Sequence, residues 1–270
     1  MHPPVLMLVF FIAVICYGAA LGLLARSLLR GAPINVRLVP GLIIAGLIAH
    51  ALTLIPSFSS DNLLEFTLFD MVSLTSWLML YFSLIMTARV RVLALNALAA
   101  GVALIGISAE AIAQHFFYLS AEPHTMTPLL ALHVIASIAA YSLLFMAAVQ
   151  AFLLLQQNRE LKHRRSARWV KLLPPLQSME RLLKSMLVIG FGSLSVALVL
   201  GFFAVQDLFA QHLAHKTVFS LASWLLFAWL LISGYRSGFR AQRMAKQTLV
   251  GFVLLAIGFF GSKFVLQVLV

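Results

Sequence analysis

The chain has 270 residues, of which 62% are hydrophobic and only 10% are charged, and its mean hydropathy is +1.02. So few charges cannot cover the surface of a soluble domain of this size, so the composition excludes the water-soluble class and makes lipid the solvent for most of the chain. The formal net charge of +11 would suit a nucleic-acid-binding protein, but the distribution of the charges indicates a membrane protein.

The basic residues are grouped along the chain. Of the 19 Lys and Arg residues, 17 fall in segments 26–37, 89–91, 159–184 and 236–246. Segments that hold most of the acids alternate with them, which is the pattern of the positive-inside rule. The acids of the intervening segments are Asp61, Glu65, Glu110, Glu122 and Asp207. We therefore expect the basic segments to face the cytoplasm and to contact anionic lipid headgroups, with no role in nucleic-acid binding.

The first stretch, residues 1–24, is apolar and superficially similar to a secretory signal. It has no positive leading region, and Arg26, Arg30 and Arg37 follow it, so we predict a retained first span whose N-terminus lies outside. The single cysteine, Cys16, lies in this run, so disulfides, dithiol redox pairs and thiolate metal clusters within the chain are excluded.

Seven further apolar segments are each long enough to cross a bilayer. The predicted spans are 38–57, 64–87, 91–111, 128–153, 185–207, 215–235 and 247–268. The predicted fold is an all-α integral membrane bundle of about eight transmembrane helices, with both termini on the outer side of a bacterial inner membrane. Residues 1–270 are predicted to form one membrane domain. In the long loop 156–184, Pro174 and Pro175 precede LQSMERLLKSML, which we expect to be an amphipathic lead-in to the sixth span.

Three ionisable side chains lie at similar predicted depths in the outer leaflet. His50 is about seven residues, or roughly 10 Å, from the outer end of the second span, and His133 is about five residues, or roughly 8 Å, into the fifth. Asp70 is about six residues into the third span. Ionisable groups inside a membrane cost free energy, so each is a functional hypothesis by default. We therefore treat the three residues as one polar layer.

Two chemistries suit this layer. A haem between two helices needs two neutral imidazoles at matched depth, each about 2 Å from the iron, and a carboxylate can fix the tautomer of one ring. A carboxylate beside a histidinium can instead form a proton relay. Each residue also has a purely structural interpretation, as a hydrogen-bonded imidazole or as a carboxyl group that is paired or protonated. The remaining histidines are expected to be exposed or interfacial: His2, His115, His124, His163, His212 and His215.

Four segments resemble the integral-membrane cytochrome c assembly proteins, the group that contains CcsA, CcmC and CcmF, and especially its HemX-like and YpjD-like branch. They are TLFDMVSLTSW (67–77), ALHVIASIAAYSLLF (131–145), LPPLQSMERL (173–182) and HKTVFSLASWLLFAWLL (215–231). The likeness covers nearly the whole chain and is strongest over 128–270. It implies a protein that handles haem in the membrane and presents it at the outer face for attachment to apocytochrome c.

The resemblance also assigns roles to individual residues. His133 matches the haem-ligating histidine of the family's LHV-type segment, and Asp70 takes the place of the acid before an SW pair. Lys216 matches the basic position after the family's tryptophan-rich, haem-presenting loop. That loop has no counterpart here, because FFAVQDLFAQHLAH precedes Lys216 without a tryptophan.

Two further histidine positions of the family also differ in this chain. Ser262 and Lys263 occur in the last span, and Gly234 occurs late in the seventh, where the family would have histidines. These differences argue against transfer of haem to an apocytochrome, and they leave the expected haem binding through His50 and His133 unaffected.

Three functions follow. The preferred one is a haem-binding protein, not an enzyme, related to cytochrome c biogenesis. It would hold haem b near the outer leaflet, with His50 and His133 as axial ligands to the iron and Asp70 beside one of them. Its partners would be haem and other subunits of a cytochrome-assembly or membrane complex. The alternatives are a transporter or transporter subunit with a His/Asp relay, and a scaffold whose polar layer only joins helices.

Overall fold

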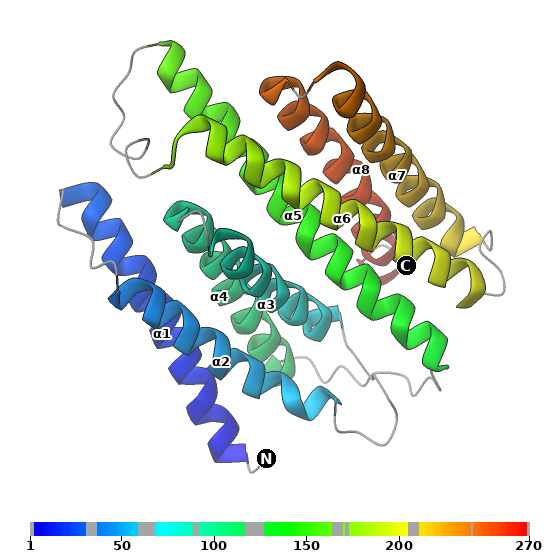
Figure 1. Cartoon of the computed structure of the whole chain (residues 1–270). Helices are drawn as coiled ribbons and strands as arrows, with labels where there is room; N and C mark the ends of the chain where they lie inside the picture. The colour runs from blue at the N-terminus through cyan, green and yellow to red at the C-terminus, as the bar shows by residue number, and fades with distance from the viewer. Residues whose placement is uncertain are drawn as a thin grey trace. The chain divides into compact units, whose positions relative to one another are not determined.

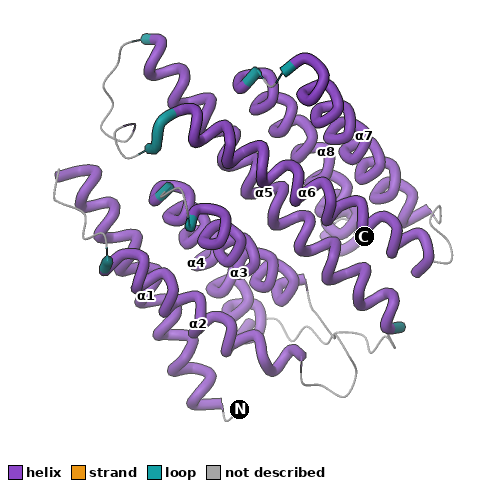
Figure 2. The backbone as a smooth tube through the Cα atoms, in the orientation of Figure 1, coloured by secondary structure: helices purple, strands orange, loops and turns teal. Residues whose placement is uncertain are grey.

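The described residues of the computed structural model are 3–30, 37–58, 68–88, 92–116, 127–163, 170, 173–204, 211–238 and 240–268. Within them, all regular structure is helical and no strand occurs (Figure 2). The helices are α1 (Pro3–Arg30), α2 (Leu38–Phe58), α3 (Leu68–Thr87), α4 (Leu93–Phe116), α5 (Pro128–Lys162), α6 (Leu176–Ala204), α7 (Gln211–Ser237) and α8 (Ala241–Val268).

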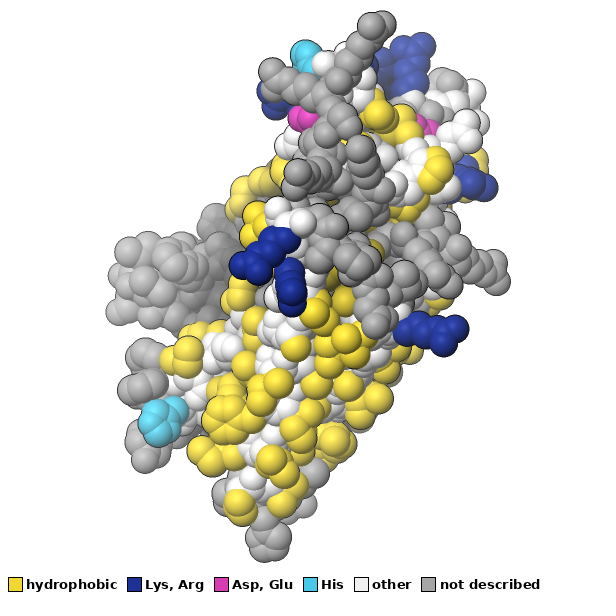
Figure 3. Space-filling view, turned by 90° about the vertical axis from the view of Figure 1, so that its left-hand side faces the viewer, with side chains coloured by type: hydrophobic (Ala, Val, Ile, Leu, Met, Phe, Trp, Pro, Cys, Tyr) yellow, Lys and Arg dark blue, Asp and Glu magenta, His cyan; other side chains and the backbone are white. Residues whose placement is uncertain are grey.

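Seven of these helices, α1 to α7, are long and apolar enough to cross a membrane, by a search limited to the described residues. The predicted all-α integral membrane fold is therefore confirmed. Large apolar side chains are exposed along the helices, for example Met7, Phe11 and Ile15 on α1. Among the coloured side chains in the lowest third of Figure 3, hydrophobic ones predominate and no Lys or Arg is seen, as a lipid-facing surface requires. The eighth crossing and the outer position of both termini stay predictions.

The helices α5 and α6 each extend well beyond the span predicted for them. α5 begins at Pro128, where the side chain of Thr127 accepts a hydrogen bond from the backbone N–H of Leu130 at 3.3 Å. It continues to Lys162, beyond the predicted end at 153, since no Gly or Pro occurs before that point. The amphipathic segment after the prolines is continuous with α6, so the expected lead-in is confirmed as the first turns of that helix.

The chain divides into two compact units. Unit 1 comprises Met1–Met126 and Ala167–Leu173, and unit 2 comprises Thr127–Ser166 and Pro174–Val270. In unit 1, α1 packs on α2 and α4, and α3 packs on α4; in unit 2, α5 packs on α6 and α8, and α7 packs on α8 (Figure 1). Each unit is thus a four-helix arrangement with the same order of neighbours. The prediction of one membrane domain concerns both units together and stays a prediction.

Successive helices approach closely at a glycine. In each of the pairs α1–α2, α3–α4, α5–α6 and α7–α8, a Cβ built on one glycine would lie within 3 Å of a side chain of the facing helix. The facing pairs are Tyr17 with Gly46, Ser76 with Gly106, Leu144 with Gly190, and Phe227 with Gly251. Small residues of this kind let helix backbones approach in lipid, where association depends on packing and hydrogen bonds.

The α3–α4 contact gives a prediction for stability. A Cβ on Gly106 would lie 2.8 Å from Ser76 Cβ, an atom that cannot swing away from its own backbone. We expect Gly106→Ala to lower the free energy of unfolding by about 1–3 kcal/mol through overpacking. Gly101→Ala on the same helix is the matched control, because its nearest neighbour, Leu21 Cδ1, is 4.0 Å away. Unfolding in mixed micelles measures both, and equal stability of the two variants would contradict this packing.

Candidate functional site

His50 on α2 lies in the interior of unit 1 and has no exposed surface. Its Nε2 is 2.9 Å from the Ser73 hydroxyl oxygen on α3, and its Nδ1 is 3.4 Å from the Tyr17 hydroxyl oxygen on α1. A neutral imidazole offers one N–H donor and one acceptor, and each hydroxyl can take either role. Both ring nitrogens are therefore satisfied by unit 1 itself, in either tautomer.

A pair of carboxyl groups lies beside this imidazole. Asp70 is one turn before Ser73 on α3 and is buried, with 6% of its surface exposed. Glu110 on α4 is equally buried, and its carboxyl group is close enough to Asp70 and Ser73 to interact with both electrostatically. Gln114 donates a hydrogen bond to Glu110 Oε1 at 3.2 Å, whereas Oε2 is buried without a hydrogen-bond partner among the described residues. Four helices thus converge on one buried polar cluster, which we call the unit 1 cluster: Tyr17, His50, Asp70, Ser73 and Glu110.

Sequence reasoning found only His50 and Asp70 of the unit 1 cluster. Glu110 counted there as an acid at the outer end of a span predicted to finish at 111, whereas α4 continues to Phe116 and buries it. The available signal was the helical spacing of Gly106, Glu110 and Gln114, which places all three on one face of α4. Ser73 and Tyr17 carried no such signal, because hydroxyl side chains are common within membrane helices.

His133 on α5 is held differently, inside unit 2. Its Nδ1 is 2.8 Å from the backbone carbonyl oxygen of Ala197 on α6. A carbonyl oxygen only accepts, so Nδ1 carries the proton and Nε2 keeps its lone pair. The described residues provide no hydrogen bond to Nε2. This is the usual arrangement of a metal-binding histidine, in which the second ring nitrogen donates to a carbonyl group and fixes the tautomer.

The surroundings of His133 restrict the position of its ring. Gly201 on α6 lies against the imidazole, since a Cβ on this glycine would be 2.7 Å from His133 Cε1. Lys216 on α7 is near enough to act on His133 electrostatically, so a positive charge accompanies this imidazole. The side chain of His133 is only partly buried, in contrast to that of His50.

The structure thus brings His50 and Asp70 into one cluster of unit 1 and places His133 in unit 2. The pairing of the two imidazoles across one haem concerns both units and stays a prediction. Within the described residues, no group of three or more His, Cys, Asp or Glu side chains is placed to hold a metal ion. The tryptophan-free segment 205–210 and the side chains of Ser262 and Lys263 lie outside the described part of the chain.

Other buried polar side chains join neighbouring helices. The Trp77 indole donates to the backbone carbonyl of Leu47, and the Ser223 hydroxyl donates to that of Gly251. Gln150 on α5 donates to the Met179 carbonyl on α6 at 3.1 Å. These bonds show that polar contacts do connect the helices within each unit.

Comparison with known families decides the ancestry of the chain. The sequence matches the family described as "Cytochrome C assembly protein" over residues 44–270, a region that includes all of unit 2 and both candidate histidines. The chain belongs to the cytochrome c assembly protein family.

Two relatives match different shares of the chain, one of them nearly all of it and the other about half. The protein is 27% identical over 264 residues to the inner membrane protein YpjD of Escherichia coli K12, with 96% of this chain and 97% of YpjD covered. It is 34% identical over 143 residues to an uncharacterized 28.8 kDa protein of Azospirillum brasilense, with 51% of this chain covered. No solved structure matches the chain. The predicted family and the predicted multi-pass location in a bacterial inner membrane are therefore confirmed.

In this member of the cytochrome c assembly family, the support that Ser73 gives to His50 can be tested by mutation. Ser73→Ala leaves His50 Nε2 without its partner in a fully buried position, which we expect to cost about 1–3 kcal/mol of unfolding free energy. Ser76→Ala is the matched control on the same helix, because the Ser76 hydroxyl donates only to the Ser73 carbonyl. Thermal unfolding in detergent measures both. Equal midpoints for the two variants would show that Ser73 does not support the imidazole.

Proposed function

We propose that this protein binds haem b in the membrane, in a role related to cytochrome c biogenesis, with His133 as an axial ligand to the iron. The observation that supports this most is the hydrogen bond from His133 Nδ1 to the Ala197 carbonyl, which leaves the Nε2 lone pair directed away from that bond. Membership of the cytochrome c assembly family provides the reason to expect haem rather than another metal centre. The iron would supply the ligand-binding and redox chemistry, and the chain would supply binding and orientation.

The residues around His133 also match the negative charge of a haem. Haem carries two propionates, and Lys216 places a positive charge near the ligand. Gly201 removes a side chain that would otherwise collide with the imidazole. We therefore assign His133 to the iron and Lys216 to the propionate side.

His50 and Asp70 belong to the same proposal as the second ligand and its carboxylate neighbour. In the structure both nitrogens of His50 have hydroxyl partners, so binding to iron requires the Ser73 or Tyr17 hydroxyl to give up its contact. That exchange makes His50 the weaker ligand of the two. The proposed role is binding and handling of haem, without a catalysed reaction.

Absorption spectroscopy of the purified protein tests the proposal. We expect a Soret band with the sharp α and β bands of six-coordinate haem, and His133→Ala should abolish haem retention because it removes the preorganised ligand. His50→Ala should keep part of the haem and convert it to a five-coordinate spectrum. His115→Ala, on the exposed end of α4, is the control and should leave the spectrum unchanged.

A second pair of variants separates loss of the ligand from loss of the fold. Gly201→Ala would push on the imidazole, whereas Gly192→Ala on the same helix meets nothing within 4 Å. Haem retention should fall in the first variant only. Protein that stays colourless after incubation with haem, at unchanged thermal stability, would overturn the haem assignment.

The unit 1 cluster favours a second candidate function, a proton relay. Glu110 Oε2 is buried without a hydrogen-bond partner among the described residues, and Asp70 and His50 lie within the same cluster. Carboxyl groups and an imidazole at this spacing can hold and pass a proton inside a membrane. Haem binding is measured by absorption and proton transfer by flux, so the two candidate functions can be tested separately.

Proton flux into proteoliposomes tests the relay. If the relay operates, Asp70→Asn and Glu110→Gln should each reduce flux by about tenfold or more, because an amide cannot exchange the proton. Glu160→Gln at the far end of α5 is the control and should keep the wild-type rate. Flux that is absent in the wild-type protein, or equal in all four proteins, would remove this candidate.

A further inference from the structure

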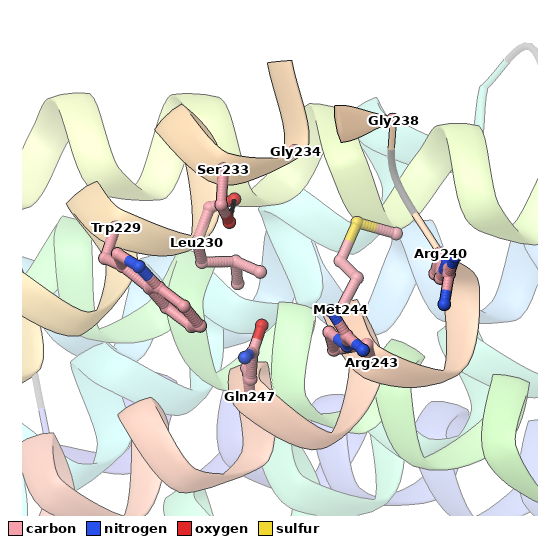
Figure 4. Close-up of a pocket in the computed structure, with 9 residues that line it drawn as sticks. All are labelled: Trp229, Leu230, Ser233, Gly234, Gly238, Arg240, Arg243, Met244 and Gln247. Carbon is pink, nitrogen blue, oxygen red and sulfur yellow. Dashed lines mark hydrogen bonds between the residues drawn. The ribbon is translucent and has the colours of Figure 1, made fainter. Parts of the chain in front are cut away.

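A pocket of about 340 Å³ lies between the end of α7 and the start of α8, at the turn that contains Gly238. It belongs wholly to unit 2 and has no part in the haem proposal or in the unit 1 cluster. The side chains come from both helices, with the Trp229 indole at one end and the Arg240 side chain at the other (Figure 4). Arg243, Met244 and Gln247 lie along the α8 side between them.

The pocket has an excess of positive charge that the neighbouring chain does not balance. Arg240 and Arg243 line it and are exposed, and neither forms an ion pair with a described carboxylate. No Asp or Glu occurs anywhere in residues 208–270, so neither α7 nor α8 can supply a counter-ion. The first turn of α8 begins at Ala241, beside these arginines, and its N–H groups add to the positive potential. The ligand that suits this end of the pocket is a phosphate group.

The rest of the lining combines apolar side chains with the polar Ser233 and Gln247. Leu230 and Met244 are almost completely buried in its wall, and the exposed Trp229 forms its far end. Tryptophan favours the boundary between headgroups and acyl chains, while arginine binds the phosphate level. A free phosphate ion would use only the arginine end, whereas a phospholipid would fill both.

The predicted sidedness agrees with a lipid ligand. Segment 236–246 is one of the basic segments expected at the cytoplasmic surface, where anionic lipids concentrate. Basic pockets between transmembrane helices on that side are known binding places for anionic headgroups.

We propose that this pocket binds the phosphate of an anionic phospholipid headgroup through Arg240 and Arg243, with the glycerol and upper acyl region against Leu230, Met244 and Trp229. The site would anchor the α7–α8 hairpin at the cytoplasmic surface. It is independent of haem, so it can be tested whether or not the haem proposal holds.

Native mass spectrometry of the full chain, purified in a neutral detergent and supplied with phosphatidylglycerol, tests the site. The pocket variant is Arg240→Gln with Arg243→Gln. The matched control is Arg236→Gln with Lys246→Gln, which removes the same charge from exposed positions on the same two helices that do not line the pocket. We expect the pocket variant to bind phosphatidylglycerol at least roughly tenfold more weakly than the wild type, and the control to change by less than about threefold.

Two further arms identify the ligand. Phosphatidylcholine should lose less affinity than phosphatidylglycerol in the pocket variant, because its choline cation offsets the charge of its phosphate, and an equal loss for both lipids would overturn the preference for an anionic headgroup. Inorganic phosphate should fail to compete with phosphatidylglycerol, and effective competition would overturn the lipid assignment in favour of a soluble phosphate. If the pocket and control variants lose affinity for phosphatidylglycerol equally, the site itself is overturned, because only diffuse charge would then attract the lipid. Thermal unfolding without lipid should be the same for all variants, so a folding defect is recognised separately.

Discussion

Hydrocarbon contains no water, so each polar group inside the membrane needs a partner from the protein. Helices satisfy the backbone, and the side chains find partners on neighbouring helices, as Trp77 does at Leu47 and Ser223 does at Gly251. Close packing accompanies these bonds, and a glycine lies against a side chain of the facing helix in the pairs α1–α2, α3–α4, α5–α6 and α7–α8. Packing and polar contacts therefore depend on one another in both units.

The same constraint separates the two histidines that sequence reasoning treated as equivalent. His50 has hydroxyl partners at both nitrogens and no exposed surface, so hydrogen bonds hold its imidazole in the interior of unit 1. His133 has one nitrogen fixed by a carbonyl group and is only partly buried, so its other nitrogen keeps the capacity to bind a metal. The similar depth predicted for the two rings therefore does not fix their chemistry, because depth along a span does not determine what surrounds a ring.

Acidic and basic side chains are concentrated in different parts of the chain. The carboxyl groups of Asp70 and Glu110 are both buried in unit 1, where they share a cluster with His50. The last 63 residues of the chain, 208–270, have no acid, and four of their six Lys and Arg residues lie in segment 236–246 at the α7–α8 turn. The first distribution suits chemistry inside the membrane, and the second suits contact with anionic headgroups at its surface.

The sequence by itself determined the membrane class, the helical fold and the family, because long apolar runs and alternating charged loops follow directly from the free energy of transfer into lipid. It also selected His50, Asp70 and His133, since ionisable residues in such runs are rare. Only the tertiary structure decided which hydroxyl groups surround His50, that Glu110 is buried beside Asp70, and that Ala197 fixes the tautomer of His133. These facts depend on the rotation of each helix about its axis, which packing at glycines sets and which hydropathy along one chain does not encode.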